Sequence, residues 1–170
     1  MKTLWAPWRL EYILDDTPDK KTGCIFCPRI AGNDDETNLL VYRAPRTVAI
    51  LNRYPYSNGH LLVMPQKHTG ELDDLDGKEL LELMEVTRLC LRALKLTMKP
   101  DAFNVGFNLG KGEVAGAGVP NHLHLHIVPR WAGDTSFMPV LADVKIMPEH
   151  LTQTFRKLKQ ALAEISGQAH

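Results

Sequence analysis

The chain has 170 residues, of which 44% are hydrophobic and 24% are charged, the ordinary composition of one compact globular domain. Basic and acidic residues number 20 each, and a net charge of zero argues against broad electrostatic binding to nucleic acid. No stretch approaches the roughly 20 apolar residues of a membrane span, and the N-terminus lacks the apolar core of a signal peptide. Cys24, Cys27 and Cys90 make a poor disulfide framework. We therefore expect a cytoplasmic protein with no nucleic-acid or membrane partner.

Residues 1–22 are predicted to be an N-terminal extension to a single domain over 23–170. Because exposed aromatic side chains are unfavourable, Trp5 and Trp8 are expected to pack on the body of the protein or on a partner subunit. The polar segment Asn33–Glu36 is predicted to be a surface loop. Three short strands follow, each rich in apolar residues and bounded by turn residues, at Leu39–Arg43, Thr47–Asn52 and His60–Met64.

The longest periodic segment, Gly77–Lys99, has leucines at helical spacing and predicts an amphipathic helix of about 20 residues. Asp74 or Asp76 is expected to cap this helix, and Pro100 to end it. The remaining elements are a strand, a loop with four glycines, a second strand and a C-terminal helix, at Asp101–Asn108, Gly110–Gly118, Asn121–Pro129 and Pro148–Ser166. The order predicts an α+β fold, with the long and C-terminal helices packed on an antiparallel sheet of about five strands.

The run His122-Leu123-His124-Leu125-His126 alternates histidine with leucine, which predicts a half-buried strand. The leucines then face the core, and the three histidines line the opposite face about 6.6 Å apart. Neutral imidazole is a nucleophile, and its protonated form donates hydrogen bonds to phosphate oxygens. The row therefore suits phosphoryl transfer or a shared metal, whereas a single buried histidine is more often a packing residue.

The glycine-rich loop Gly110–Gly118 directly precedes the histidines and lets backbone amides approach an anion closely. It matches neither the Walker A pattern nor GxGxxG, so its position is what favours phosphate binding. The pair Cys24 and Cys27 can supply two thiolates to one zinc, with His68 and His122 as candidates for the other two ligands. Two inert thiols or a redox pair are the alternatives. Cys90 is predicted to lie in the core, and His60 and His150 to be ordinary surface or hydrogen-bonded residues.

The stretch Gly116–Trp131 resembles the signature of the histidine triad (HIT) family, in particular its Fhit-like branch and the bacterial diadenosine polyphosphate hydrolases and phosphorylases of that branch. The resemblance covers most of the chain, including Trp5–Arg9, the CxxC pair, Ala49–Arg53, Gly59–Pro65 and Phe137–Pro139. It implies that His124 attacks the α-phosphorus and forms a nucleoside-monophosphate–histidine intermediate. It also implies that His126 contacts the phosphate oxygens.

The same resemblance implies roles for further residues. Asn52 falls where the family contacts the ribose hydroxyls, and Phe26 and Ile50 are expected to line the base. Asn108 and the backbone of Gly116, Ala117 and Gly118 fall near the phosphates. The resemblance supports a structural zinc on Cys24, Cys27, His68 and His122, with no organic cofactor, and a homodimer formed through the long helix and neighbouring strands.

Many family members have a glutamine or serine in the loop where this chain has Lys111, Gly118 and Val119. We hypothesise that the Lys111 charge suits a longer polyphosphate. The leading function is cleavage of a dinucleoside polyphosphate, either by water as a hydrolase or by phosphate as a phosphorylase, which is a nucleotidylyltransferase. A nucleoside phosphoramidase uses the same chemistry, and a non-catalytic nucleotide-binding or signalling module is the alternative from another class.

Overall fold

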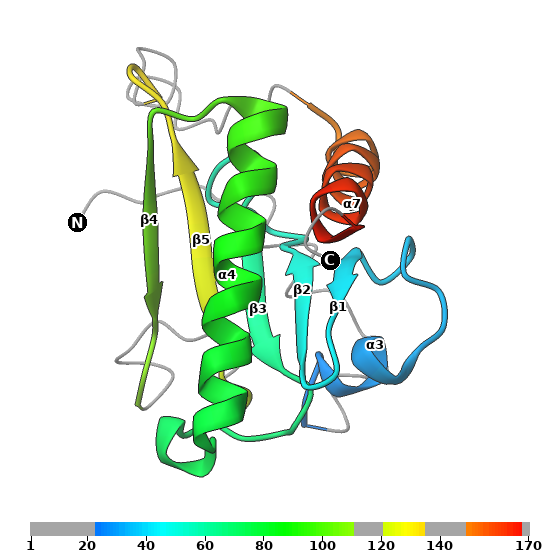
Figure 1. Cartoon of the computed structure of the whole chain (residues 1–170), viewed down its shortest axis with the longest axis vertical. Coiled ribbons are helices and arrows are strands. Elements are labelled where there is room, and N and C mark those ends of the chain that lie inside the picture. Colours follow the sequence, from blue (N-terminus) through cyan, green and yellow to red (C-terminus); the bar gives the residue numbers. More distant parts are fainter. Residues whose placement is uncertain (1–22, 111–120, 135–148, 168–170) are drawn as a thin grey trace, which may run out of the picture.

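The structure is a computed structural model that describes residues 23–110, 121–134 and 149–167 (Figure 1). Within these ranges the chain forms three α-helices, one 3-10 helix and five strands. In chain order they are α3 (Cys27–Ala31), β1 (Leu40–Arg43), β2 (Thr47–Leu51), β3 (Leu61–Pro65), the 3-10 helix Leu72–Asp74, α4 (Gly77–Met98), β4 (Ala102–Phe107), β5 (Leu125–Arg130) and α7 (Leu151–Gly167). The predicted α+β class is confirmed, while the predicted extension over 1–22 lies outside the described residues.

The five strands form one antiparallel sheet in the order β1-β2-β3-β5-β4. Strand β5, which contains the last histidine of the run, therefore lies between β3 and β4 rather than at an edge. His126 of β5 pairs with Leu62 on one side and with Gly106 on the other. This register places the last histidine of the run in the interior of the sheet, between two strands that come from distant parts of the chain.

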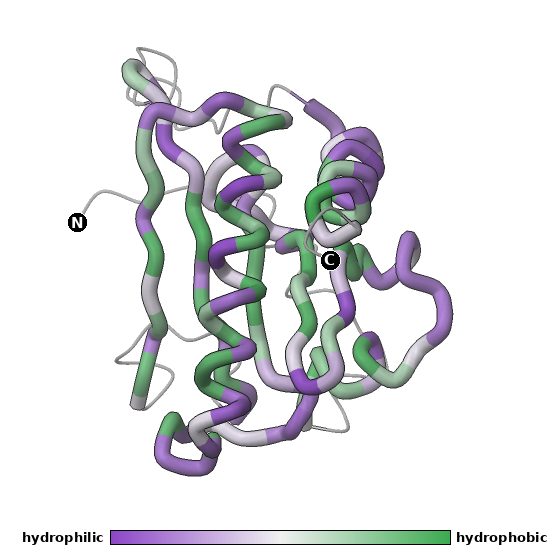
Figure 2. Tube along the Cα trace, in the orientation of Figure 1, coloured by the Kyte–Doolittle hydropathy of each residue, from purple (hydrophilic) through white to green (hydrophobic). Residues whose placement is uncertain are grey.

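Helices α4 and α7 lie side by side on one face of the sheet, α4 over the central strands and α7 over β1 (Figure 1). Figure 2 shows hydrophobic residues along the central strands and hydrophilic residues over much of α7. Because strand side chains alternate between faces, every second strand residue joins the core under these helices. This core includes Ala49, Leu51, Leu61, Val63, Leu83, Cys90, Leu94, Leu125, Ile127, Leu158 and Leu162. The predicted core position of Cys90 is confirmed.

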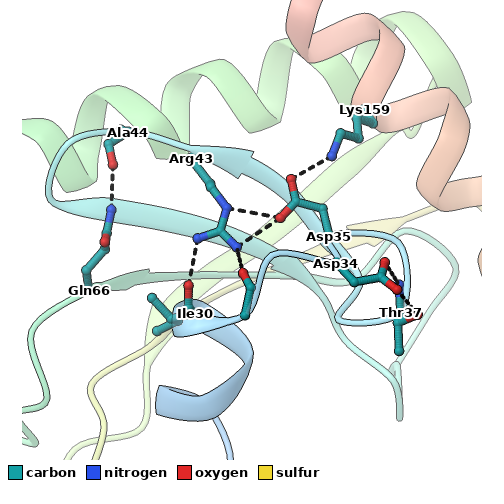
Figure 3. Close-up of polar contacts among 9 residues, drawn as sticks. Ile30, Asp34, Asp35, Thr37, Arg43, Ala44, Gln66 and Lys159 are labelled. Atoms are coloured by element: carbon teal, nitrogen blue, oxygen red, sulfur yellow. Dashed lines mark hydrogen bonds and ion pairs between the residues drawn. The ribbon is translucent and has the colours of Figure 1, made fainter.

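The opposite face of the sheet holds a second apolar cluster beneath α3, made of Cys24, Phe26, Ile30, Leu40, Val48, Ile50, Leu62 and Met64. A helix of five residues is too short to be stable alone, so it needs tertiary anchors. Arg43 of β1 donates hydrogen bonds to the carbonyls of Ile30, at 2.7 Å, and Gly32, at 2.8 Å (Figure 3). The same guanidinium pairs with Asp35 at 2.9 Å, and Lys159 of α7 reaches that carboxylate at 2.7 Å.

The start of α4 is a complete capping box, which confirms Asp76 as the N-cap. Its carboxylate accepts hydrogen bonds from the backbone amides of Lys78 and Glu79, both at 2.8 Å, and the Glu79 side chain accepts from the Asp76 amide at 2.9 Å. The helix ends where Lys99 adopts a left-handed conformation with φ of 48°, directly before Pro100. None of the described helices is both long and apolar enough to cross a membrane.

The strand predicted over Asn121–Pro129 begins only at Leu125, so the prediction was wrong for its first half. The amide of Leu123 donates to the Thr69 carbonyl of a loop at 2.6 Å, and the His124 ring bonds the carbonyl of His122 at 2.7 Å. These bonds occupy groups that a strand ladder would otherwise use. The predicted alternation of the side chains is nevertheless present, since Leu123 points into the core under α4 as Leu125 does.

Candidate active site

The three histidines of the run lie on the sheet face opposite α4, together with Phe26. His122 is fully buried and His124 is 7% exposed, while His126 is only partly buried. The rings of His124 and His126 are 4.9 Å apart between centroids, and the Phe26 ring lies 5.3 Å from His124 and 5.6 Å from His122. Phe26 therefore forms an apolar wall against the first two histidines. Ile50 is buried in the cluster that contains Phe26.

His124 has one ring nitrogen committed to the backbone and one available. Its Nδ1–H donates to the carbonyl of His122 at 2.7 Å, which leaves the lone pair on Nε2. Burial lowers the pKa of His124 below its ordinary value, and the hydrogen bond to the His122 carbonyl only partly opposes this shift. The ring is therefore neutral at neutral pH, the state in which Nε2 is a nucleophile.

His126 contacts a fourth histidine, His60, which immediately precedes β3. The backbone amide of Tyr56 donates to His60 Nδ1 at 3.1 Å, so this nitrogen is an acceptor and the proton of the neutral ring is on Nε2. His60 Nε2 lies 2.9 Å from His126 Nδ1 and donates to it. His126 must then have its own proton on Nε2. Burial, with a smaller contribution from His124, lowers the pKa of His126 to about 4.

The surroundings of His60 and His126 are polar and aromatic. Asn52 places its side-chain amide nitrogen 3.2 Å from His60 Nδ1, and Asn108 places its own 3.4 Å from His126 Nε2. The Asn108 amide can turn to present its oxygen to the Nε2–H of His126. Tyr56 stacks on His60 at 4.8 Å and on His126 at 5.9 Å between ring centroids. The site therefore has an apolar side at Phe26 and a polar side at His126.

A compact group of possible metal ligands adjoins the first histidine. The ligand atoms of Cys24, Cys27, His68 and His122 all lie within 4.8 Å of one another. His122 Nδ1 lies 3.4 Å from the sulfur of Cys24 and 3.6 Å from that of Cys27, and His68 Nδ1 lies 3.3 Å from the Cys27 sulfur. Bonds of about 2.3 Å to sulfur and 2.0 Å to nitrogen around a tetrahedral zinc separate sulfur from nitrogen by about 3.5 Å. The cluster thus has the donor types and spacing of a metal site.

The orientation of His122 also suits a metal ligand. Its Nε2–H donates to the carbonyl of Pro65 at 2.9 Å, which leaves the Nδ1 lone pair pointing at the two sulfurs. Such a hydrogen bond from the second nitrogen is the usual way in which proteins fix the tautomer of a metal-bound histidine. Burial lowers the pKa of His122, and the bond to the Pro65 carbonyl opposes this shift. The neutral ring is the form that binds metals.

The structure brings together most of the residues that the sequence singles out. Asn52, Asn108, Phe26, His124 and His126 gather around one site, and the cysteines with His68 and His122 adjoin it. The predicted contacts Lys111, Gly116, Ala117 and Gly118 lie outside the described residues, as do the segments that contain Trp5, Trp8 and Phe137.

Sequence reasoning missed His60 and Tyr56. The expectation that His60 is an ordinary surface or hydrogen-bonded residue was wrong about the surface, since its exposure is 0%. His60 shares a sheet face with Leu62, which is the partner of His126 across the sheet. The pairing of β3 with β5 was the missing information, because it joins residues 66 positions apart. In the sequence, His60 is only a histidine between a turn and an apolar run, and nothing local indicates that it contacts His126.

A five-stranded antiparallel sheet with this histidine row defines the HIT class of proteins, and the HIT domain model matches residues 33–133. The chain belongs to this family. It resembles the structure of a Zn-bound histidine triad family protein from Mycobacterium smegmatis, with a TM-score of 0.68 and 29% identity over 86% of this chain and 98% of that one. The structure of a hypothetical histidine triad nucleotide-binding protein from Sulfolobus tokodaii gives a TM-score of 0.66 at 29% identity, over 86% of this chain and 96% of that one.

Two relatives with named activities are similar in sequence. The AP-4-A phosphorylase of Mycobacterium tuberculosis is 37% identical over 163 residues, which cover 93% of this chain and 83% of that protein. The asymmetrical bis(5'-nucleosyl)-tetraphosphatase of Schizosaccharomyces pombe is 36% identical over 95 residues, which cover 56% of this chain and 50% of that protein. The names of both relatives describe the cleavage of dinucleoside polyphosphates.

Proposed function

We propose that this protein is an enzyme that cleaves a dinucleoside polyphosphate by transferring a nucleoside monophosphate to Nε2 of His124. The proposal rests on one observation above the others. The bond from His124 Nδ1–H to the His122 carbonyl, at 2.7 Å, leaves a neutral, buried ring with its lone pair on Nε2. When Nε2 bonds phosphorus, the ring becomes a cation, and the same carbonyl stabilises the charge on Nδ1–H.

The apolar side of the histidine row, at Phe26, suits the nucleoside of the substrate, and the polar side, at His126, suits the phosphates. Phe26 offers an apolar surface to a base, and Asn52 lies near enough to the histidines to contact a ribose. His126, with its proton on Nε2, donates a hydrogen bond to a phosphate oxygen beside the reacting phosphorus. The departing polyphosphate retains the electron pair of the broken P–O bond. Ile50, Lys111 and the Gly116–Gly118 backbone complete the proposed contacts to base and phosphates.

The acceptor of the nucleotide from His124 is inorganic phosphate or water. We favour phosphate, because the similarity to the AP-4-A phosphorylase extends over 93% of this chain, further than the similarity to the tetraphosphatase. Attack by phosphate on the histidine-bound AMP yields ADP and frees His124. Attack by water yields AMP instead.

The test is incubation with diadenosine tetraphosphate, with and without labelled inorganic phosphate. A phosphorylase forms ATP and labelled ADP only when phosphate is present, whereas a hydrolase forms ATP and AMP in both reactions. The His124→Asn variant should lose turnover and still bind the nucleotide. No turnover by the intact protein under either condition would support a non-catalytic nucleotide-binding module instead.

We further propose that the cluster of Cys24, Cys27, His68 and His122 holds one structural zinc. Four protein ligands fill a tetrahedral zinc and leave no open position for substrate, which distinguishes this site from a catalytic zinc. Burial raises the pKa of the Cys27 thiol to about 11, with further contributions from Cys24. The two histidines beside the thiols favour a metal site over a redox pair, because redox chemistry of a CxxC pair needs only the two cysteines. Metal analysis of the purified protein should find about one zinc per chain.

We also propose a homodimer. Leu81, Met84, Val105 and Leu109 are between 45% and 61% exposed, on α4 and along or just after β4. Strand β4 is an edge of the sheet, and no described helix lies over it (Figure 1). An open edge next to apolar side chains is a natural place for a second copy to pair. A cytoplasmic location and the lack of a nucleic-acid partner remain predictions from composition.

A further inference from the structure

His122 contributes its side chain to the cysteine–histidine cluster and its main-chain carbonyl to the hydrogen bond with His124. Its side chain is a fully buried member of the cysteine–histidine cluster, 3.4 Å from the Cys24 sulfur. Its main-chain carbonyl accepts the hydrogen bond from His124 Nδ1 at 2.7 Å. One residue therefore joins the cluster to the nucleophile, with no intervening side chain. Any change in the position of His122 must move the acceptor that fixes the protonation pattern of His124.

The cluster holds His122 against two other segments. Cys24 and Cys27 come from the start of α3, and His68 comes from the loop after β3. The loop and the histidine run are also joined through the backbone, since the Leu123 amide donates to the Thr69 carbonyl at 2.6 Å. Each of these two residues directly follows a cluster histidine. The cluster and this backbone hydrogen bond therefore hold together the same two segments, the loop after β3 and the histidine run.

The ring of His122 is held at two points. Its Nε2–H is bound to the Pro65 carbonyl at 2.9 Å, and its Nδ1 faces the sulfurs. Only the second point depends on a metal. A divalent ion that bonds Nδ1, His68 and two thiolates fixes the plane of the ring, and with it the adjacent backbone. Two neutral imidazoles and two thiolates around a divalent ion have no net charge, so the cluster acts on His124 through position rather than charge.

We propose that His122 is a positioning residue through which metal occupancy of the Cys24–Cys27–His68–His122 cluster holds His124 as the Nδ1–H tautomer with its lone pair on Nε2. The inference rests on the proposed roles of His124 and of the metal. In this role the metal does more than stabilise the fold, because it controls the protonation of one atom, His124 Nδ1. Loss of the metal should release the His122 carbonyl and let the proton of His124 distribute between both nitrogens. The nucleophile is then incorrectly protonated for part of the time.

The test uses the full chain loaded with zinc, then treated with a chelator at neutral pH, then reloaded. The first measurement is ¹⁵N NMR of the His124 ring nitrogens, which reports the tautomer without any substrate. The second is turnover of diadenosine tetraphosphate, and the third is far-UV circular dichroism as a measure of folding. We expect a single Nδ1–H tautomer with zinc, a mixture of tautomers without zinc and at least a tenfold loss of turnover. Both should recover on reloading, with the circular dichroism unchanged throughout.

Two variants of the exposed loop sharpen the result. His68→Ala removes the exposed ligand and touches neither His124 nor the substrate contacts, so it should show the tautomer mixture at limiting zinc and recover at saturating zinc. Lys67→Ala, its neighbour outside the cluster, should behave as the unaltered protein.

A single Nδ1–H tautomer in folded, zinc-free protein would overturn the proposal. So would a tautomer change that occurs only together with global unfolding, because the metal would then act on the whole fold. A zinc-dependent tautomer in a protein with no turnover of dinucleoside polyphosphates would contradict the proposed function alone.

Discussion

His60 Nε2 lies 2.9 Å from His126 Nδ1, and this contact determines which nitrogen of His126 carries the proton. His60 Nδ1 already accepts a hydrogen bond from the Tyr56 amide, so His60 can only donate through Nε2. His126 is thereby obliged to present an N–H, rather than a lone pair, from its other nitrogen. In the proposed reaction this N–H donates to a phosphate oxygen. We therefore predict that His60 acts on the proposed reaction through His126, although it precedes the histidine run by more than sixty residues.

Replacing His60 with asparagine should lower kcat by about a hundredfold, because His126 then loses the donor that fixes its tautomer. The Michaelis constant should change much less, since the contacts of Phe26 and Asn108 remain. His150→Asn, an exposed histidine just before α7, is the matched control and should leave kcat within twofold, by a rough estimate for a surface site. The measurement is steady-state turnover of diadenosine tetraphosphate. Equal loss of kcat in the two variants would contradict this role for His60.

Much of this fold could be predicted from the sequence. The helix α4 and strands β1 to β3 follow from periodicity, apolar runs and the Asp76 cap, which are local signals. The residue at which β5 begins could not be predicted from the sequence. The hydrogen bonds from Leu123 to Thr69 and from His124 to His122 compete with the hydrogen bonds of the strand. Local alternation does not reveal such bonds.

The residues of the site also fall into two groups, those that the sequence predicts and those that it does not. The proposed nucleophile, His124, and the CxxC pair belong to short motifs that can be recognised along the chain. His60, Tyr56 and the closeness of His68 to Cys27 depend on the strand order β3-β5-β4 and on a loop that returns to the start of α3. Those are long-range relationships that a single sequence does not contain.

Stability should fall on the acid side of neutrality partly because of His126. The pKa of this residue is lowered from 6.5 to about 4 in the folded protein, so between these values the unfolded chain binds the proton first. The contribution to the free energy of unfolding is fully present above pH 6.5 and is lost as the pH falls to about 4. The pKa values of His122 and His124 shift in the same direction and should add to the slope.

Urea unfolding at pH 7 and pH 5 tests this origin of the pH dependence. The unaltered protein should lose stability between the two conditions, and His126→Asn should lose less of it. His150→Asn provides the comparison for a histidine outside the site. A pH dependence that is the same in His126→Asn as in the unaltered chain would show that His126 does not contribute.

Asp76→Ala should reduce the free energy of unfolding by about 1 kcal/mol, because it removes the acceptor for two backbone amides at the start of α4. Asp73→Ala, which changes a nearby exposed aspartate that is not a helix cap, should have an effect of only a few tenths of a kcal/mol. Both can be measured by urea unfolding at pH 7. Similar losses in the two variants would mean that net charge, rather than capping, stabilises this end of the helix.

Met84→Glu should convert the proposed homodimer into monomers. Met84 is 54% exposed on α4 and lies on one stripe with Leu80 and Leu91, and a carboxylate buried there at an interface is strongly unfavourable. Leu96→Glu is the matched control. Leu96 is 65% exposed on the same helix but is rotated by about 120° from Met84. Analytical ultracentrifugation should show at least a tenfold weaker dimer for Met84→Glu, since each 1.4 kcal/mol of interface energy is a factor of ten. Loss of the dimer in Leu96→Glu alone would place the interface on the other side of α4.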